Sequence, residues 1–405
     1  MPPEDTRSGL PNLLYLSHCV PNPPDKGEKI RAHFELASLT KKYRVHLVCF
    51  ARKSSELMDM NQVSKYCASV HVELLSFLPA LTGAAAHFAA GDCLNMRFYQ
   101  NSRIRRYVQD LVQRVPFAAA ISYSVVMVPY IPSGLPYILD MQDVDSEKWF
   151  QYSNTRQPGF LYALEAKRLR RIEVRHAEKA YRSFFTTRQE EKLFRSFAPS
   201  TSTATMENGV DFDLFDPETT PQLPELAGRR YVVFLGTMDY YPNSDAVCSF
   251  AETVFPELRR RDPNMEFFIV GRSPSRAVAA LGRTPGITVT GAVADPRPYL
   301  KGASAFVAPL KIARGIQNKV LESLAMGKWV LASTAVCHTF GESLPHGLIH
   351  CAQPTAYADA LSAGLKADGT EIRQRARGRF EWGTNVQNLM GDVDSLVQQS
   401  VAVRS

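Results

Sequence analysis

Short apolar runs alternate with longer segments of helical periodicity along most of the chain. Near the start, apolar runs at residues 12–17 and 44–50 predict strands, and the amphipathic segment 28–42 between them predicts a helix. Two strands joined through a helix are typical of a βαβ unit with parallel strands. Further strands are predicted, with helices between them, at residues 69–74, 118–122, 137–140 and 183–187.

The same alternation starts again after a break in the middle of the chain. Residues 197–205 are rich in turn-forming residues, and 217–224 begins and ends with proline, which is typical of a linker. The strands predicted after this break are residues 231–235, 266–270, 287–290, 305–308 and 328–332.

This rhythm predicts an α/β protein made of two doubly wound, Rossmann-like domains that face each other across a cleft. We expect the first domain to span residues 1–205 and the second 206–384, because 405 residues exceed one ordinary core. A helix at about 385–405 is expected to pack back on the first domain. Ligands of such folds bind at the carboxyl ends of the strands.

Composition places the chain among globular proteins, with 45% hydrophobic and 21% charged residues. No apolar run approaches the roughly 20 residues that span a bilayer, and the first residues lack the layout of a signal peptide. These features predict a cytoplasmic protein. The 7 cysteines are scattered without CxxC spacing, which favours reduced thiols over a zinc site.

Positive charge is concentrated in the first half of the chain. Residues 1–200 hold 27 Lys and Arg against 19 Asp and Glu, whereas residues 201–405 hold 20 against 21. Seven of the cations lie within 165–182, a segment with helical periodicity. This basic segment could contact anionic lipid at the inner membrane face or a phosphorylated acceptor, or it could be a solvated helix face. Nucleic acid is disfavoured, because no aromatic residues are interleaved with the charge.

Residues 313–327 have the pattern of an anion-binding loop that leads into a short helix. Gly315 suits a tight turn, and Asn318 is expected to cap the helix that follows. Lys319 lies in the first turn, where the helix dipole disfavours a cation by roughly 0.3–1 kcal/mol unless a phosphate is also bound there. Glu322 is its neighbour and suits a ribose or sugar hydroxyl. The alternative is an exposed ion pair between Lys319 and Glu322 on a surface helix.

Five short motifs follow one another along the chain, at residues 21–27, 208–211, 236–243, 269–271 and 315–322. In this order and spacing they resemble the retaining GT-B glycosyltransferases of glycosyltransferase family 4. The closest resemblance is to bacterial sugar transferases associated with exopolysaccharide and PEP-CTERM sorting systems. The resemblance covers nearly the whole chain. It implies the GT-B fold and the retaining transfer of a sugar from a nucleotide-diphosphate sugar to a hydroxyl, in the synthesis of exopolysaccharide or cell-surface glycan.

The resemblance also implies roles for residues around the loop. Glu322 matches the second glutamate of the family's Glu-x7-Glu motif, which holds the donor ribose, but Arg314 stands where the first glutamate is expected. The cations that the family places after the first strand of its second domain are missing from 236–243. We therefore expect Lys319, Arg314 and Arg272 to neutralise the diphosphate. The remaining predicted donor contacts are Gly27, Gly236, Thr237, Gly271, Val293, Gly315, Ile316, Gln317 and Asn318.

On the acceptor side, Asp140 and Asp143 follow a predicted strand at the place where many family members have a histidine. A carboxylate there could accept the proton of the acceptor hydroxyl, so both are candidate catalytic residues, together with Lys319 and Arg314. A structural alternative has Asp145 or Ser146 capping the next helix. His18, a lone histidine after the first strand, is interpreted as structural.

The expected partners are a nucleotide sugar and a glycan or lipid-linked acceptor, with no cofactor and no metal. No Asp-x-Asp motif lies in a strand-end apolar context that would recommend a metal; Asp143 and Asp145 have this spacing but lie in the first domain, on the expected acceptor side. Three alternatives stay open: a sugar-nucleotide epimerase of the same architecture, a nicotinamide-dependent dehydrogenase, and a non-catalytic carbohydrate-binding relative. The dehydrogenase is disfavoured because no G-x-G-x-x-G follows a predicted strand. The departure at Arg314 keeps the non-catalytic relative open.

Overall fold

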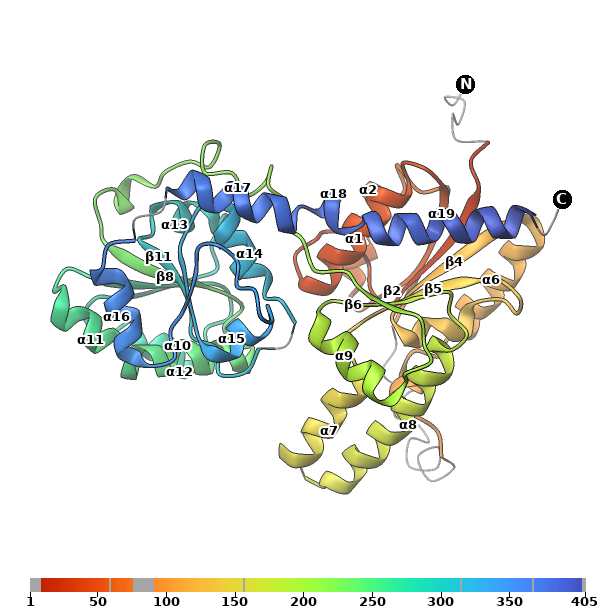
Figure 1. Cartoon of the computed structure of the whole chain (residues 1–405), viewed down its shortest axis with the longest axis horizontal. Helices are drawn as coiled ribbons and strands as arrows, with labels where there is room; N and C mark the ends of the chain where they lie inside the picture. The colour runs from red at the N-terminus through yellow and green to blue at the C-terminus, as the bar shows by residue number, and fades with distance from the viewer. Residues whose placement is uncertain are drawn as a thin grey trace. The chain divides into compact units, whose positions relative to one another are not determined.

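The computed structural model describes residues 9–57, 60–75, 91–155, 157–313, 315–365 and 368–402. The chain divides into two compact units (Figure 1). The first comprises Met1–Met206 with Val386–Ser405, and the second comprises Glu207–Asn385. The boundary predicted between residues 205 and 206 lies one residue before this division.

The described residues of the first unit form a parallel sheet of seven strands in the order β3-β2-β1-β4-β5-β6-β7. The chain reverses its direction of travel across the sheet between β1 and β4, which is the switch point where ligands of doubly wound folds bind. The strands are β1 (Asn12–Ser17), β2 (Arg44–Ala51), β3 (Ser69–Leu74), β4 (Phe117–Tyr123), β5 (Tyr137–Gln142), β6 (Ser183–Phe185) and β7 (Thr203–Thr205). The helices of this unit include α1 (Gly27–Leu39), α2 (Met60–Val63), α5 (Leu94–Phe98), α6 (Ser102–Arg114), α7 (Asp145–Thr155), α8 (Gly159–Ala177) and α9 (Arg188–Phe197), with short 3-10 turns η1 (Ser54–Leu57) and η2 (Val125–Tyr130).

The second unit repeats this plan with six parallel strands in the order β10-β9-β8-β11-β12-β13. Its strands are β8 (Tyr231–Leu235), β9 (Glu266–Val270), β10 (Ile287–Gly291), β11 (Ala305–Ala308), β12 (Val330–Ala332) and β13 (Leu348–His350). Its helices include α10 (Tyr241–Thr253), α11 (Phe255–Arg261), α12 (Arg276–Leu281), α13 (Arg297–Gly302), α14 (Asn318–Ala325), α15 (Thr334–His338), α16 (Pro354–Ser362), α17 (Gly369–Phe380) and α18 (Trp382–Asn385), with the turn η3 (Pro224–Leu226).

Central strands of both sheets are buried along nearly their whole length. All five residues of β8 and all seven of β4 are buried, because helices cover both faces of a parallel sheet. This explains why strands of continuous apolar sequence were predictable. Two of the four described outer strands, β7 and β13, were not predicted, and the segment that contains β7 was interpreted as a turn-rich domain boundary. Each has only three residues and pairs at one edge of its sheet.

The C-terminal helix α19 (Gln387–Ala402) belongs to the first unit and packs on β4. Two ion pairs between described residues link α19 to the rest of the unit. A carboxylate oxygen of Asp392 lies 3.0 Å from the guanidinium group of Arg182, and one of Asp394 lies 2.9 Å from Nζ of Lys42. The Asp394 carboxylate also accepts a hydrogen bond from the hydroxyl of Tyr43. None of the described helices is long and apolar enough to cross a membrane.

The ends of β8 and β9 meet at two glycines whose backbones are too close for any side chain. A Cβ added at Gly271 would lie 1.7 Å from the carbonyl oxygen of Gly236. The substitution Gly271→Ala is therefore expected to lower the free energy of unfolding by roughly 3 kcal/mol, because the two strand ends would have to separate. Urea unfolding of the full chain measures this. The control Gly378→Ala, in open space on α17, should leave stability unchanged or slightly higher, and equal effects of the two changes would contradict the close packing.

Candidate active site

Two of the predicted donor motifs meet at one edge of the second sheet. Gly236 and Thr237 directly follow β8, and helix α14 follows β11 after a loop. Because β8 and β11 are parallel neighbours, both segments leave the sheet at the carboxyl ends of their strands. This is the edge at which parallel α/β folds bind their ligands.

Lys319 of α14 is fixed by a residue that sequence reasoning did not select. Its Nζ donates a hydrogen bond of 2.5 Å to Oδ1 of Asn243, in the first turn of α10, and lies 4.4 Å from the centre of the Phe234 ring. Asn243 is 6% exposed, and its amide nitrogen donates to the carbonyl oxygen of Thr237 at 3.0 Å. The amide is thus oriented by the backbone, and it aims its oxygen at the ammonium group.

Glu322 lies one turn further along α14 and is partly buried. Within the described part of the chain its carboxylate accepts no hydrogen bond, so the predicted alternative of a Lys319–Glu322 ion pair is not formed. Burial raises the pKa of Glu322 to about 7, although the charge of Lys319 opposes this shift. Burial likewise lowers the pKa of Lys319 to about 7, against the charge of Glu322. Burial therefore disfavours the charged form of both side chains. A ligand with an anionic group for Lys319 and a hydrogen-bond donor for Glu322 would stabilise these charged forms.

The start of α14 differs from the sequence prediction by one residue. Gln317 is the N-cap, and its side chain does not cap the helix, whereas Asn318 is the first helical residue. The Oδ1 of Asn318 accepts a hydrogen bond of 3.3 Å from Asn208. The Asn-Gly-Val-Asp motif therefore contacts the amino end of the helix, where the first backbone N–H groups have no partner within the helix and attract anions.

The glycines of these motifs shape the backbone around Lys319. A Cβ at Gly236 would lie 2.7 Å from the amide nitrogen of Asn243, so glycine leaves room for the residue that holds the lysine. Gly315 adopts a positive φ of 59°, and its carbonyl oxygen accepts from the side chain of Gln317 at 3.3 Å. Ile316 is 4% exposed and belongs to the hydrophobic core. Its predicted donor contact is therefore corrected: the side chain packs inward, and only its backbone could face a ligand.

Two more predicted donor residues lie at neighbouring strand ends. Arg272 follows β9, is exposed, and makes no side-chain hydrogen bond or ion pair with any described residue. Ser273, beside it, has a positive φ of 57°, a strained conformation that is frequent at functional sites. Val293 follows β10 and packs partly against the core. Arg314, the residue at the place of the missing glutamate, lies outside the described residues.

In the first unit, the structure corrects the catalytic role predicted for Asp140. Its side chain is fully buried, and Arg31 donates to both of its oxygens, at 2.6 and 3.1 Å. Arg31 also donates at 2.6 Å to the carbonyl oxygen of Met206, directly after β7. Asp140 thus anchors a buried arginine that ties α1 to the end of the sheet, and no acceptor can reach it. The burial of Glu35 beside this pair raises the pKa of that carboxyl group.

Asp143 is partly exposed, just beyond β5. Its Oδ1 accepts a hydrogen bond of 2.8 Å from the hydroxyl of Thr186, and the residue before it, Gln142, has a positive φ of 66°. Asp143 stays the acceptor-side candidate. The proposed capping role of Ser146 is wrong, because its hydroxyl instead donates to Glu173 at 2.5 Å. Gly27 is exposed at the start of α1, where its backbone is open to a ligand.

The first unit also has a cluster of polar side chains, at the carboxyl ends of its strands, that the sequence analysis did not predict. Nε2 of His18 lies 3.5 Å from Glu28, and Arg52 lies 3.2 Å from the other oxygen of the same carboxylate. Burial alone would raise the pKa of Glu28, but the hydrogen bond from His18 and the surrounding positive charge outweigh it and lower this pKa to about 2. The positions of these residues relative to the strands could have indicated the cluster. His18 follows β1, Glu28 lies in the first turn of α1, and Arg52 follows β2. All three therefore lie at the carboxyl edge of the first sheet, where parallel α/β folds commonly bind ligands.

The described residues include no group of three or more His, Cys, Asp or Glu side chains that could hold a metal ion. Asp143 of the Asp-x-Asp pattern is engaged with Thr186 instead. Metal independence stays a prediction.

Comparisons with known proteins concern the second unit and the fold of the chain. Residues 229–367 match the model of the family described as glycosyl transferases group 1. No curated protein matches the chain. Among solved structures, a sucrose-phosphate synthase from Thermosynechococcus elongatus superposes with a TM-score of 0.67 at 15% identity, over 97% of this chain and 100% of that one. Anabaena Alr3699/HepE in complex with UDP gives 0.66 at 15% identity, over 95% and 100%.

A third structure is WaaG, a glycosyltransferase involved in lipopolysaccharide biosynthesis. It gives a TM-score of 0.56 at 13% identity, over 96% of this chain and 99% of that one. At these identities the likeness establishes the fold, and it confirms the prediction of two parallel-sheet, Rossmann-like units of the GT-B class. The second unit thus carries a glycosyl transferases group 1 domain, in a chain with the GT-B fold.

Proposed function

We propose that the protein is a glycosyltransferase that moves a sugar from a nucleoside-diphosphate sugar to a hydroxyl group, with retention at the anomeric carbon. The observation that carries the proposal is the Lys319–Asn243 pair at the amino end of α14, one turn before Glu322, whose carboxylate has no hydrogen-bond partner among the described residues. It is supported by the group 1 match of the same residues.

Each group has a role in donor binding. Glu322 accepts hydrogen bonds from the ribose hydroxyls, because its carboxylate is partly buried and has no hydrogen-bond partner within the part of the chain that the structure describes. Lys319 and the amino end of α14 hold the diphosphate, and the exposed Arg272 adds a second cation. UDP is the first nucleotide to test, since structures with this fold have been determined with UDP and with UDP-glucose.

The proposed reaction requires stabilisation of the leaving group and does not require a nucleophile from the protein. The bond between the anomeric carbon and the diphosphate oxygen breaks, and the acceptor oxygen bonds to the same face of that carbon. The acceptor proton passes to the departing phosphate oxygen, so the atoms balance without a cofactor or a metal. Lys319 neutralises the charge that develops on the diphosphate. A cation held in a fixed position stabilises such a developing charge effectively.

The acceptor is a glycan or a lipid-linked saccharide, and the product belongs to an exopolysaccharide or another cell-surface glycan made at the cytoplasmic side of the membrane. Asp143 is the acceptor-side group for hydrogen bonding to the incoming hydroxyl, since it is partly exposed and Asp140 is not.

A panel of UDP-, GDP- and TDP-sugars tests the proposal, with nucleotide release followed in the presence and absence of membrane extract as the source of acceptor. We expect release with one donor class, stimulated by the extract, and an anomeric configuration in the product that matches the donor. Release with no donor, together with no nucleotide-induced shift in Tm, would exclude the transferase. Formation of an epimer without acceptor would identify an epimerase instead.

Donor affinity is expected to fall as the pH rises above about 7. The lowered pKa of Lys319, about 7 in the free protein, means that its charged form predominates only below that pH, and the diphosphate binds the charged form. Above pH 7, binding must take up one proton, so the Kd should rise by up to about tenfold per pH unit. Titration calorimetry with UDP-glucose between pH 6 and 8.5 measures this, because its diphosphate does not titrate in that range.

The variant Glu322→Gln provides the matched control for this pH dependence. The charge of Glu322 raises the pKa of Lys319, so its removal should move the midpoint of the affinity change below pH 7. A constant Kd across the range in the natural protein would show that Lys319 does not meet the diphosphate.

A further inference from the structure

Helix α8 presents a stripe of residues that changes from apolar to basic along its length. Phe160, Leu164, Lys167, Arg171 and Arg175 follow one another at intervals of three or four residues, so they lie within roughly 80° around the helix axis. All five are exposed, and Phe160 and Leu164 expose 71% and 38% of their surface. We call these five residues the α8 stripe. Nothing in the donor site accounts for it.

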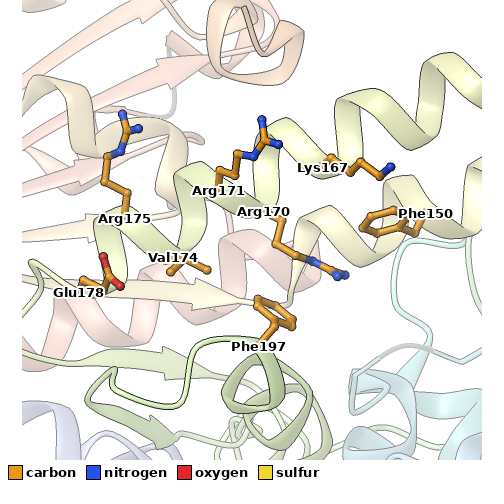
Figure 2. A pocket seen from close by; sticks show the side chains of 8 residues that line it. All are labelled: Phe150, Lys167, Arg170, Arg171, Val174, Arg175, Glu178 and Phe197. Carbon is orange, nitrogen blue, oxygen red and sulfur yellow. The ribbon is translucent and has the colours of Figure 1, made fainter. Parts of the chain in front are cut away.

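The three cations of the α8 stripe are not engaged in holding the fold together. Within the described part of the chain, Lys167, Arg171 and Arg175 form no ion pair. Arg170 is different: it pairs with Glu147 at 2.5 Å and lies between the rings of Phe150 and Phe197, at 4.4 and 4.3 Å from their centres. Figure 2 shows Arg171 and Arg175 pointing away from Phe197 and Lys167 extending toward Phe150, while Arg170 points to the side of the helix that faces Phe197.

A cavity of about 570 Å³ lies beside these cations, between α7, α8 and α9. Its lining combines the three stripe cations and Arg170 with the apolar side chains of Phe150, Val174 and Phe197, and a single carboxylate, Glu178. Cations beside apolar walls suit a ligand that is itself anionic at one end and apolar at the other.

We infer that the α8 stripe docks the protein on an anionic lipid bilayer. Phe160 and Leu164 enter the region of the acyl chains, and Lys167, Arg171 and Arg175 meet the lipid phosphates. An acidic protein or a nucleic acid would match the cations but would leave Phe160 without a role.

The inference is independent of the proposed transfer reaction and is tested separately. The full chain is sedimented with vesicles of pure phosphatidylcholine and with vesicles in which about a third of the lipid is phosphatidylglycerol. We expect binding to the anionic vesicles only, and its loss at high salt. Each cation near an anionic surface contributes about fivefold, so the triple variant K167Q/R171Q/R175Q should bind roughly 100-fold more weakly. The double variant F160S/L164S should bind the anionic vesicles at least about tenfold more weakly than the natural protein.

A matched control removes the same charge from another exposed helix of the same unit. Arg103, Arg106 and Arg114 are exposed on α6, and the variant R103Q/R106Q/R114Q should keep nearly all of the vesicle binding. The variant Phe160→Trp reports insertion: its fluorescence should shift to the blue with anionic vesicles and not with neutral ones. Equal losses in the two triple variants, or full binding by F160S/L164S, would overturn the inference. The nucleotide-induced shift in Tm should be unchanged in all of these variants, which separates docking from donor binding.

Discussion

Replacement of Lys319 by alanine is expected to lower kcat/KM for sugar transfer by about 10²–10³-fold, while Tm changes little. The side chain sits in the first turn of α14, where its ammonium group is held by Asn243 and the Phe234 ring and its pKa is lowered by burial. Such a cation is costly to keep in the free protein and becomes favourable when the leaving diphosphate develops charge. Initial rates with saturating acceptor and a range of donor concentrations measure the loss.

Two further variants show whether charge alone or its position matters. Lys311 is exposed on the loop between β11 and α14 and pairs with Asp245. Lys311→Ala should therefore change kcat/KM by less than about twofold. Asn243→Ala leaves Lys319 in place but removes the oxygen that positions it, and should produce an intermediate loss that falls mainly on kcat. If Lys319→Ala retained full activity, the diphosphate would have to be held elsewhere.

Replacement of Glu322 by alanine is expected to weaken UDP binding by more than tenfold. The carboxylate is partly buried and accepts no hydrogen bond from any described residue, so the ribose hydroxyls would be its first partners. Hydrogen bonds to a charged group are worth about 1.5–3 kcal/mol each, which corresponds to roughly 10- to 150-fold in affinity. Calorimetry with UDP measures the change directly.

An analogue that lacks both ribose hydroxyls makes this test specific. The natural protein should bind 2′,3′-dideoxy-UDP more than tenfold more weakly than UDP, whereas Glu322→Ala should bind the two equally. If the variant still discriminated between them, another residue would hold the ribose.

Much of the fold follows from local sequence, because central parallel strands are continuous apolar runs. The runs at β8 and β9 coincide with their predicted bounds, and both strands are almost wholly buried. β7 and β13 escaped prediction since three residues at a sheet edge carry too little apolar pattern. Their strand conformation is set by pairing with β6 and β12 rather than by their own residues.

The candidate site was only partly predictable, because its decisive contacts join residues far apart in the chain. Lys319 and Glu322 could be selected from their place in a short motif, but Asn243 lies 76 residues from Lys319. Asp140 was misjudged for the same reason: its partner Arg31 is 109 residues away, and no local pattern indicates that the two are paired. His18 was set aside as a lone histidine, although Glu28 and Arg52 join it at the strand ends.

Hydrogen–deuterium exchange with and without a UDP-sugar tests the central claim most directly, namely that the β8–α10 turn and the start of α14 form the donor site. We expect protection on nucleotide addition in peptides that cover residues 236–243 and 315–322, and its loss in the Lys319→Ala and Glu322→Ala variants. The peptides of the α8 stripe should not change. Protection elsewhere with none in these two segments, at a nucleotide concentration that shifts Tm, would contradict the account.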